Sequence, residues 1–230
     1  MPLRYDLHIH SSLSPCAEDD MTPANIAGFA KLAGAELIAV TDHNSARNLP
    51  AARAACAAYG VRLLPGIEVN TAEEIHLLCY FPTVETALAY GDALYAALPA
   101  LPYDETIWGR QLVMDENDNI TGTVEKLLTG AAGWDLEEAK RRCEALGGVA
   151  VPAHIDADSY SVLAMLGLFP TELGFAAAEV HLPEKLPGLV AAGFVPPGLE
   201  ILHSSDAHQL ADVANTLWEL APDSALNKLL

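Results

Sequence analysis

Two histidines near the amino terminus, His8 and His10, have the spacing of paired metal ligands on a β-strand. They end the short run Asp6-Leu7-His8-Ile9-His10. Side chains two residues apart on a strand point to the same side, so both imidazoles can reach one ion. Imidazole is a frequent ligand of divalent transition metals. The pair alone is a weak signal, and it gains weight only because further potential ligands follow along the chain.

These further histidines and carboxylates each lie beside a strand-like apolar run. Most follow the run, at the end where α/β barrels and open α/β sheets build their sites. His76 is the exception, because it precedes the apolar run 77–81, and its depth in the fold is left open. A single histidine at a strand end is more often structural than a ligand, but a series of them favours a metal site. The remaining members of the series are His43, Glu68, His154, Asp206 and His208.

This donor set predicts hydrolysis assisted by metal ions. Several neutral imidazoles with carboxylates suit zinc, manganese or iron better than calcium or magnesium. A carboxylate has two oxygens and can bridge two ions, and a hydroxide shared by two ions about 4 Å apart can attack phosphorus in line. We recognise no Ser-His-Asp arrangement and no P-loop in the sequence.

Helix-like segments alternate with the strand-like runs, which predicts an α/β fold with parallel strands. Thr22 and Pro23 suit the cap and the first position of a helix that runs toward Gly34. An alanine-rich helix is expected over 49–59, ending at Gly60. Another begins at Asp135 and ends near Gly147-Gly148.

The segment 83–134 interrupts this alternation within an expected single domain, residues 1–230. A helix is predicted over 84–98 and a β-hairpin over 111–124, with an Asp/Asn-rich turn between its strands. We expect the hairpin to lie over the mouth of the fold and to set substrate selectivity.

Composition narrows the classes of partner. Twelve Lys and Arg against 31 Asp and Glu give a net charge of −19, which disfavours long nucleic acid as a partner. No apolar run is long enough to span a bilayer, and no leader is recognisable, so no membrane partner is expected and the location is expected to be cytoplasmic. The scattered cysteines Cys16, Cys56, Cys79 and Cys143 fit a reducing compartment. The oligomeric state is open.

In its full set of motifs the chain resembles the PHP family, named for polymerase and histidinol phosphatase. The resemblance runs from residue 5 to about 208, and it implies a distorted (β/α)7, TIM-like barrel with two or three divalent ions (Zn, Mn or Fe). One ion would be held by His8, His10, Glu68 and Asp206, a second by Glu68, His76 and His154, and a third by His43 and His208. The motifs are His8-Ile9-His10, Thr41-Asp42-His43, Gly66-Ile67-Glu68, His76, Pro152-Ala153-His154 and Ser205-Asp206-Ala207-His208.

One expected ligand of the family is missing from its usual place. An Asp or His commonly follows His-x-His at the position where this chain has Pro15. The replacement is left open among Cys16, Glu18, Asp19 and Asp20, with Cys16 and Asp20 carried as candidate ligands. A thiolate there would favour zinc over manganese.

The resemblance implies a phosphoesterase that acts on a small phosphorylated substrate, a phosphomonoester such as histidinol phosphate or a nucleotide. A metal-bridging hydroxide would attack, with Glu68, Asp206 and His208 in the catalytic set and His208 or a metal-bound water protonating the leaving oxygen. Arg47 and Arg110 are candidates for binding phosphate, because the planar guanidinium binds two oxygens. The alternatives are a non-catalytic metal-binding module with a regulatory role and, more weakly, C–N hydrolysis of the amidohydrolase type.

Four polar residues near the series are given supporting positions. Asp42 is expected to orient His43, and Asp6 to orient the first histidine pair. His203 is expected to donate to a ligand or to a carbonyl. His181 is placed at the surface, with a position at the mouth of the fold as the alternative.

Overall fold

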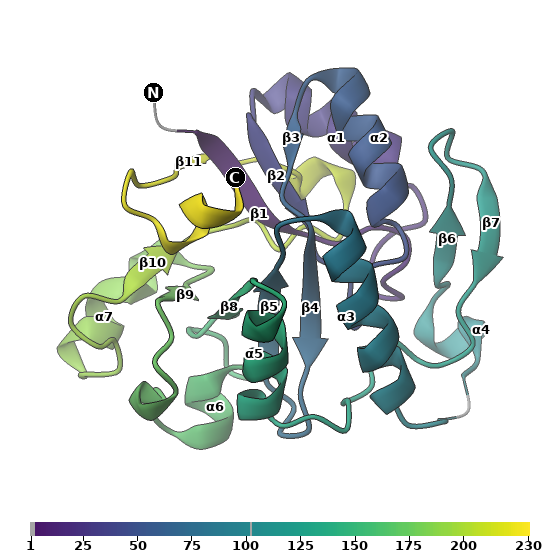
Figure 1. The fold of residues 1–230 in the computed structure, drawn as a ribbon. Helices are drawn as coiled ribbons and strands as arrows, with labels where there is room; N and C mark the ends of the chain where they lie inside the picture. Colours follow the sequence, from purple (N-terminus) through teal and green to yellow (C-terminus); the bar gives the residue numbers. More distant parts are fainter. Residues whose placement is uncertain (1–2, 102) are drawn as a thin grey trace.

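The computed structural model describes residues 3–101 and 103–230, and its strands pair in four hydrogen-bonded sheets (Figure 1). The first sheet has the order β11-β1-β2-β3. Strands β1, β2 and β3 run parallel, the first two motifs lie on or just after β1 and β2, and β11 pairs antiparallel with β1. The bounds are β1 (Arg4–Ile9), β2 (Leu37–Val40), β3 (Arg62–Leu63) and β11 (Trp218–Glu219).

The second sheet corrects the expectation of parallel strands. Its order is β4-β5-β8, and β5 runs antiparallel to both neighbours. A third sheet pairs β9 with β10 in parallel. The bounds are β4 (Gly66–Asn70), β5 (His76–Tyr80), β8 (Val149–Pro152), β9 (Ala177–Glu179) and β10 (Glu200–Leu202).

Single contacts join these sheets at the ends of their strands. His43 bridges in parallel to Glu68, and Ile9 bridges in parallel to Ala207. The Ile155 N–H donates to the Glu179 carbonyl just beyond β8. The fold is therefore mixed α/β, as expected. A closed barrel is not found among the ladders of the described ranges, so the finer barrel prediction is not confirmed.

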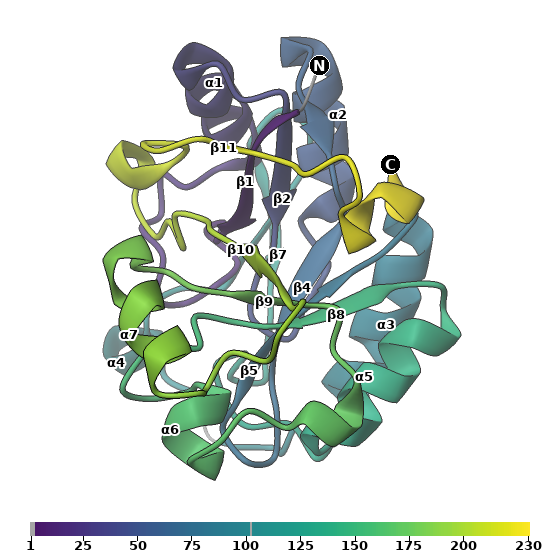
Figure 2. The same ribbon diagram turned by 90° about the vertical axis from the view of Figure 1, so that its left-hand side faces the viewer.

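The predicted helices form, with the capping residues expected. Thr22 accepts the N–H of Asn25 at the start of α1, and Gly34 ends it in the left-handed region. Gly60 ends α2 in the same way. Asp135 caps α5 by accepting the N–H of Glu138. Their apolar faces pack on the sheets (Figure 2). The bounds are α1 (Pro23–Ala33), α2 (Leu49–Tyr59), α3 (Val84–Ala97) and α5 (Leu136–Ala145).

In the segment 83–134, which follows β5, the helix and the hairpin form as predicted. The hairpin does not have the position that the sequence suggested. The hairpin of β6 (Leu112–Met114) and β7 (Ile120–Thr123) stands beside α1 and α2 at the edge of the molecule (Figure 1). The Leu112 N–H donates to the Ser12 carbonyl at 2.9 Å, and Asp118 accepts the Thr22 hydroxyl at 2.6 Å. The hairpin therefore braces the loop after β1. The expectation that it lies over the mouth of the fold is wrong.

A short helix, α4 (Glu105–Trp108), and Gly109 bring this segment against the loop after β1. Gly109 has a φ of +91°, and a Cβ there would lie 2.0 Å from the Pro15 carbonyl oxygen. Only glycine fits such an approach. The segment and the loop therefore pack as one piece.

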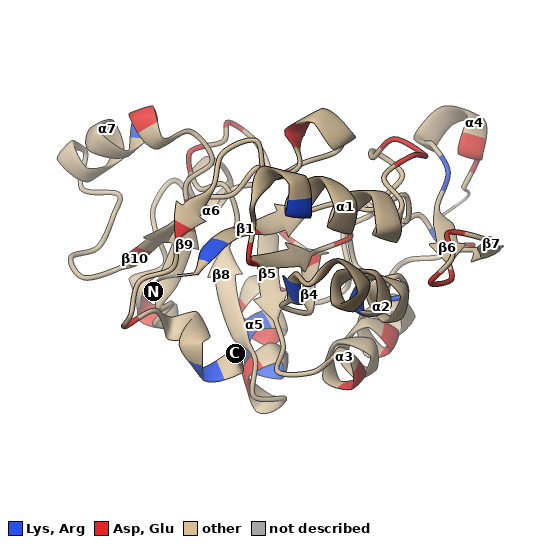
Figure 3. Ribbon diagram, turned by 90° about the horizontal axis from the view of Figure 1, so that it is seen from above, with Lys and Arg blue, Asp and Glu red and all other residues tan. Residues whose placement is uncertain are grey.

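The remaining helices are short and lie between β8 and the carboxyl terminus. None of the helices in the described part of the chain has the length and apolarity needed to cross a bilayer. Figure 3 shows acidic residues spread over many elements, with fewer basic ones. The short helices are α6 (Val162–Leu166), η1 (Thr171–Leu173), η2 (Pro183–Lys185), α7 (Leu186–Ala191), η3 (Leu210–Asp212) and η4 (Ala225–Leu229).

Candidate metal centre

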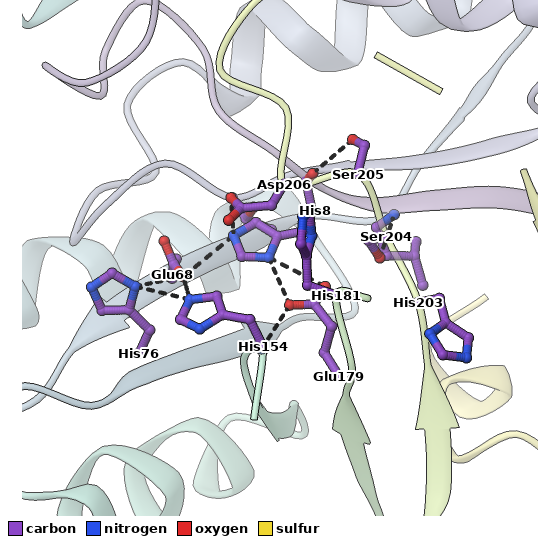
Figure 4. Close-up of polar contacts among 12 residues, drawn as sticks. His8, Glu68, His76, His154, Glu179, His181, His203, Ser204, Ser205 and Asp206 are labelled. Carbon is purple, nitrogen blue, oxygen red and sulfur yellow. Dashed lines mark hydrogen bonds and ion pairs between the residues drawn. The ribbon is translucent and has the colours of Figure 1, made fainter. Parts of the chain in front are cut away.

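The side chains of the ligand series meet at one edge of the sheets. His8 lies on β1, Glu68 on β4 and His76 on β5, whereas the others follow β1, β2, β8 and β10. Figure 4 shows His76 and His154 pointing toward Glu68, with His8 on its other side. The members that the structure brings together are His8, His10, His43, Glu68, His76, His154, Asp206 and His208.

The reversed direction of β5 explains why His76 precedes its strand. Because β5 is antiparallel to β4, its first residue lies at the carboxyl end of β4, where His76 pairs with Asn70. β8 is antiparallel to β5 and so returns to the direction of β4, which brings His154 to the same edge. The rule that ligands follow strands holds for parallel strands only.

Glu68 is the centre of the cluster, and five imidazoles surround its buried carboxylate. Oε1 lies 2.9 Å from His76 Nδ1 and 3.3 Å from both His8 Nε2 and His154 Nε2. Oε2 lies 3.1 Å from His43 Nδ1 and 3.3 Å from His10 Nε2. The two oxygens thus face two different groups of imidazoles.

Asp206 closes the group on the side of β1. Its Oδ1 lies 3.2 Å from His8 Nε2 and 3.3 Å from His10 Nε2. The residue has a φ of +51°, and its loop is held by Asp6, which accepts the N–H and hydroxyl of Ser205. Asp6 therefore positions the Asp206 loop, and its link to the first histidine pair is to the backbone of His8, whereas the sequence had suggested that it orients that pair.

Hydrogen bonds behind His8 and His10 fix which ring nitrogen faces the centre. Nδ1 of His8 lies 3.0 Å from Glu179 Oε2. Nδ1 of His10 lies 2.9 Å from the Ser14 hydroxyl, which donates to Asp42 Oδ1 at 2.8 Å. Both Nδ1 atoms are then donors, so both Nε2 atoms are left as free ligand atoms. Asp42 thus acts on His10 through Ser14, whereas the sequence had suggested that it orients His43.

A second group gathers beside this centre and contains one of the two open candidates after His-x-His. One ligand atom from each of His10, Cys16, His43 and His208 lies within 4.8 Å of the others. The His208 Nδ1 lies 2.8 Å from its own loop carbonyl at Asp206, which leaves Nε2 free. Asp20 belongs to none of the clusters found among the described residues.

The ionisation of the centre follows from burial and from the close charges. Burial by itself would raise the pKa of Glu68, but His76, His8 and His43 hold it well below its usual value. Burial opposes a charge on His10, yet Asp206 and Glu68 outweigh it and raise its pKa to about 9. Burial lowers the pKa of His43 well below its usual value.

Burial and nearby charges also set the pKa values of His208 and Cys16 at the edge of the centre. Burial, with the neighbouring His10, lowers the pKa of His208 to about 4. Cys16 is exposed as a residue, but the partial desolvation of its sulfur, with the charge of Glu68, raises the pKa of the thiol to about 12. His208 is therefore neutral at pH 7, as a metal ligand must be.

The donor set fits divalent metal ions. Nε2 of His8 and Nε2 of His10 are 3.2 Å apart, and Nδ1 of His76 and Nε2 of His154 are also 3.2 Å apart. Two imidazole lone pairs repel at this distance unless a proton or a cation lies between them. Nδ1 of His43 and Oδ1 of Asp206 are buried without a hydrogen-bond partner among the described residues. Such unpaired buried atoms are costly, and a bound cation satisfies them.

A cavity of about 300 Å³ opens beside the centre. Asp156 shapes its far wall: its carboxylate accepts the N–H of His181 at 2.7 Å, and its carbonyl accepts the Lys185 ammonium at 2.9 Å. Tyr160 stacks on His76 at 4.8 Å between ring centroids. His181 therefore lies in the wall of the cavity, which agrees with a place at the mouth and not with the plain surface position that the sequence favoured.

The candidate phosphate-binding arginines lie outside this cavity. The Arg47 guanidinium sits 4.5 Å over the ring of Tyr95, and Arg110 pairs with Asp19 at 2.9 Å. Among the described residues, Lys185 is the lysine or arginine that lines the cavity. His203 has its Nδ1 2.6 Å from the Val180 carbonyl, in keeping with its predicted supporting position.

Sequence reasoning missed three residues of the site. Glu179 follows the apolar run 175–178, so the strand-end pattern used for the other ligands could have found it. Lys185 and Asp156 carry no such signal, because they meet only through the packing of two loops after β8 and β9.

With this geometry in hand, comparison with known proteins identifies a related family. The model of the PHP domain family matches residues 6–142, more than half of the chain. That range includes the ligand series as far as His76. Among curated proteins, none matches the sequence.

Several solved structures share the fold. The lesion-specific endonuclease Q of Pyrococcus furiosus aligns with a TM-score of 0.67 and 19% identity, over 91% of this chain and 49% of that one. This chain thus spans about half the length of that endonuclease, which has also been solved with a 27-mer duplex containing an abasic lesion. An amidohydrolase from Chromobacterium violaceum with bound sulfate aligns with a TM-score of 0.63 and 21% identity, over 95% and 92% of the two chains.

A third similar structure comes from Bifidobacterium adolescentis and is provisionally assigned as a metal-dependent phosphoesterase. It aligns with a TM-score of 0.59 and 20% identity, over 89% of this chain and 87% of that one. At sequence identities this low, the alignments show that these structures share a fold with this chain and nothing further.

Proposed function

Because the chain belongs to the PHP domain family, we propose that it is a metal-dependent phosphoesterase acting on a small phosphorylated compound. The observation that carries the proposal is the buried carboxylate of Glu68, whose two oxygens face different sets of imidazoles. A carboxylate placed in this way suits a bridge between two divalent ions.

Two groups of residues would hold these ions. His8, His10 and Asp206 would hold one ion with Glu68, and His76 and His154 the other; His8 lies nearest Oε1, the oxygen that His76 and His154 also face, whereas His10 lies nearest Oε2. The imidazole-rich set suits zinc, manganese or iron. When bound, a pair of such ions supplies an activated water and neutralises charge at phosphorus. We assign His208 to metal binding, because its Nε2 is free and one of its ring nitrogens lies with the donor atoms of His10, Cys16 and His43.

The chain's own residues would position the substrate in the cavity. The Lys185 ammonium has three N–H donors, and the Asp156 carbonyl takes one of them. The other two are available to non-bridging phosphate oxygens. The exposed ring of Tyr160 offers a flat surface to the leaving group.

The size and charge of the molecule favour a small substrate. A cavity of about 300 Å³ matches a small ligand, and the net charge of −19 repels a long phosphate backbone. The similar fold of endonuclease Q, solved with duplex DNA, makes a phosphodiester the second candidate substrate.

The finer description of the fold is also a proposal. Strand neighbours, together with the contacts between sheets, follow the order β1, β2, β4, β5, β8, β9, β10 and back to β1. This circular order supports a distorted seven-stranded barrel in a single domain, residues 1–230, with residues 83–134 as an insertion. A cytoplasmic location is proposed with it.

Phosphate release from a panel of phosphomonoesters tests the function. The panel includes histidinol phosphate and nucleotides, and a phosphodiester is assayed beside it. Activity that a chelator abolishes and that manganese or zinc restores is the expected result. Release from the diester alone would move the proposal to diesterase activity. Metal binding without any turnover would support the alternative, a non-catalytic metal-binding module.

A further inference from the structure

We propose that Cys16 is a thiolate ligand of a third metal position, together with His43 and His208, and that this position therefore selects zinc over manganese. The inference rests on the proposed metal centre and adds a ligand type and a metal preference to it.

The first support is convergence from separate parts of the fold. Cys16 comes from the loop after β1, His43 from the end of β2 and His208 from the loop after β10. One donor atom from each, with one from His10, lies within 4.8 Å of the others. Donors bound to a tetrahedral zinc lie about 3.5 Å apart, given Zn–N and Zn–S bonds of about 2.0–2.3 Å. Small side-chain rotations close the remaining gap.

The second support is that the surrounding contacts hold the loop in place. The Glu18 N–H donates to the His208 carbonyl at 2.9 Å, which ties the Cys16 loop to the His208 loop. Gly109 packs directly on the Pro15 carbonyl from the outside. The sulfur is therefore held beside the imidazoles by backbone contacts on both sides.

An unpaired donor on His43 points to an ion beside Glu68, where His43, Glu68 and His76 form a further potential metal cluster that shares His43 with the Cys16 group. His43 is 5% exposed, and its Nδ1 makes no hydrogen bond with the described residues, although Glu68 Oε2 is 3.1 Å away. A neutral imidazole buried next to a carboxylate without a proton between them is unfavourable. A cation shared by the two removes the conflict.

The carboxylates that could replace Cys16 as the ligand do not gather with the histidines of this position. Asp19 is engaged by Arg110 at 2.9 Å. Asp20 and Glu18 are in none of the potential metal clusters of the described residues. Of the four candidates after His-x-His, the thiol is the one that meets the histidines.

Binding of a metal ion by Cys16 involves a proton transfer and no redox change. The thiol loses its proton to solvent as the sulfur–metal bond forms, and no electron changes hands. Soft thiolate ligands select zinc, whereas manganese prefers oxygen donors. A chain with Asp at this place would discriminate less strongly against manganese, so the replacement changes the metal preference and not the fold.

Cobalt titration of the chelator-treated full chain tests the inference without an activity assay. Bound cobalt gives a thiolate-to-metal charge-transfer band only when sulfur is a ligand. We expect the band in the wild type and in Cys56→Ser, a control cysteine buried in α2. We expect Cys16→Ser to lose the band and one equivalent of bound metal. Cys16→Asp should recover that equivalent without the band, and its preference for zinc over manganese there should be smaller than in the wild type.

The outcomes separate the two proposals. Cobalt bound by the wild type without the band, or a band that survives in Cys16→Ser, would overturn the thiolate ligand and leave the Glu68 centre intact. Failure of the wild type to bind cobalt at all would overturn both.

Discussion

Nδ1 of His8 lies 3.0 Å from Oε2 of Glu179, and both side chains are buried. The same carboxylate oxygen accepts the backbone N–H of His154 at 3.0 Å. Glu179 thus orients one candidate ligand through its ring and another through its backbone, although it lies on a different strand from both.

Replacing Glu179 should weaken metal binding without removing a ligand. In Glu179→Ala the His8 ring loses its orienting acceptor, and we expect affinity to fall roughly 10- to 100-fold, as for other partners of metal-bound histidines. Glu179→Gln keeps an acceptor and should lose less. Competition with a chromophoric chelator measures the affinity. Glu172→Ala, at an exposed position, is the control; equal affinities in Glu179→Ala and the control would contradict the role of Glu179.

Glu68→Gln should fold and lose activity. The amide has nearly the same shape, but it cannot bridge two cations through two anionic oxygens. We expect turnover to fall at least on the order of a hundredfold, the usual loss for a preorganised electrostatic group, with fewer metal ions bound per chain. Phosphate release and metal analysis measure the two effects, and circular dichroism verifies folding. A folded variant with wild-type turnover would rule out the bridging carboxylate.

Lys185→Met should impair phosphate binding. The ammonium's two remaining donors are lost while its apolar stem is kept. A hydrogen bond to a charged group contributes roughly 1.5–3 kcal/mol, so kcat/KM should fall roughly ten- to a hundredfold, mostly through KM. Lys140→Met is the matched control, because Lys140 pairs with Glu144 on α5. If both variants behaved alike, Lys185 would have no part in binding substrate.

The metal-free chain should become less stable as the pH rises from about 6.5 to 9. In the folded chain the pKa of His10 is raised to about 9, because Asp206 and Glu68 outweigh the effect of burial. Since the unfolded value is about 6.5, this stabilisation is complete below pH 6.5 and is lost as pH passes the folded value. His43 and His208 have lowered pKa values and titrate below this window.

Thermal unfolding in a chelator at several pH values measures this trend. His10→Gln should weaken the trend without removing it, because the pKa values of His8 and His154 are also raised by the neighbouring carboxylates. Added metal should reverse it, because metal binding needs neutral imidazoles and is favoured at higher pH. Stability that is constant or rising across the window in the chelator would contradict the protonated His10.

The sequence predicted the helices well, because their caps and stops are local. Thr22-Pro23, Gly34 and Gly60 act within one turn of the helices that they bound. It also predicted which histidines and carboxylates gather, through their places beside strands. The sequence did not predict the direction of β5, because strand direction depends on pairing between distant residues. β5 runs antiparallel to its partners β4 and β8, and this direction brings His76 to the site.

The supporting residues were harder to predict for the same reason. Ser14 links Asp42 to His10 across the loop after β1, a contact that no spacing in the sequence announces. Lys185 reaches the cavity only because Asp156 holds the turn at His181. Arg47 and Arg110 were chosen for their chemistry alone, and Tyr95 and Asp19 engage them elsewhere.

The packing of the insertion against the loop after β1 has a consequence for control of the protein. Gly109 rests on Pro15, and Arg110 pairs with Asp19, on either side of Cys16. A molecule that bound the insertion and shifted this loop would change the affinity of the cysteine position for its ion. Thermodynamic reciprocity then requires the ion to change the affinity for that molecule by the same factor. The packing of the insertion and the geometry of the cysteine position are thus linked through one loop.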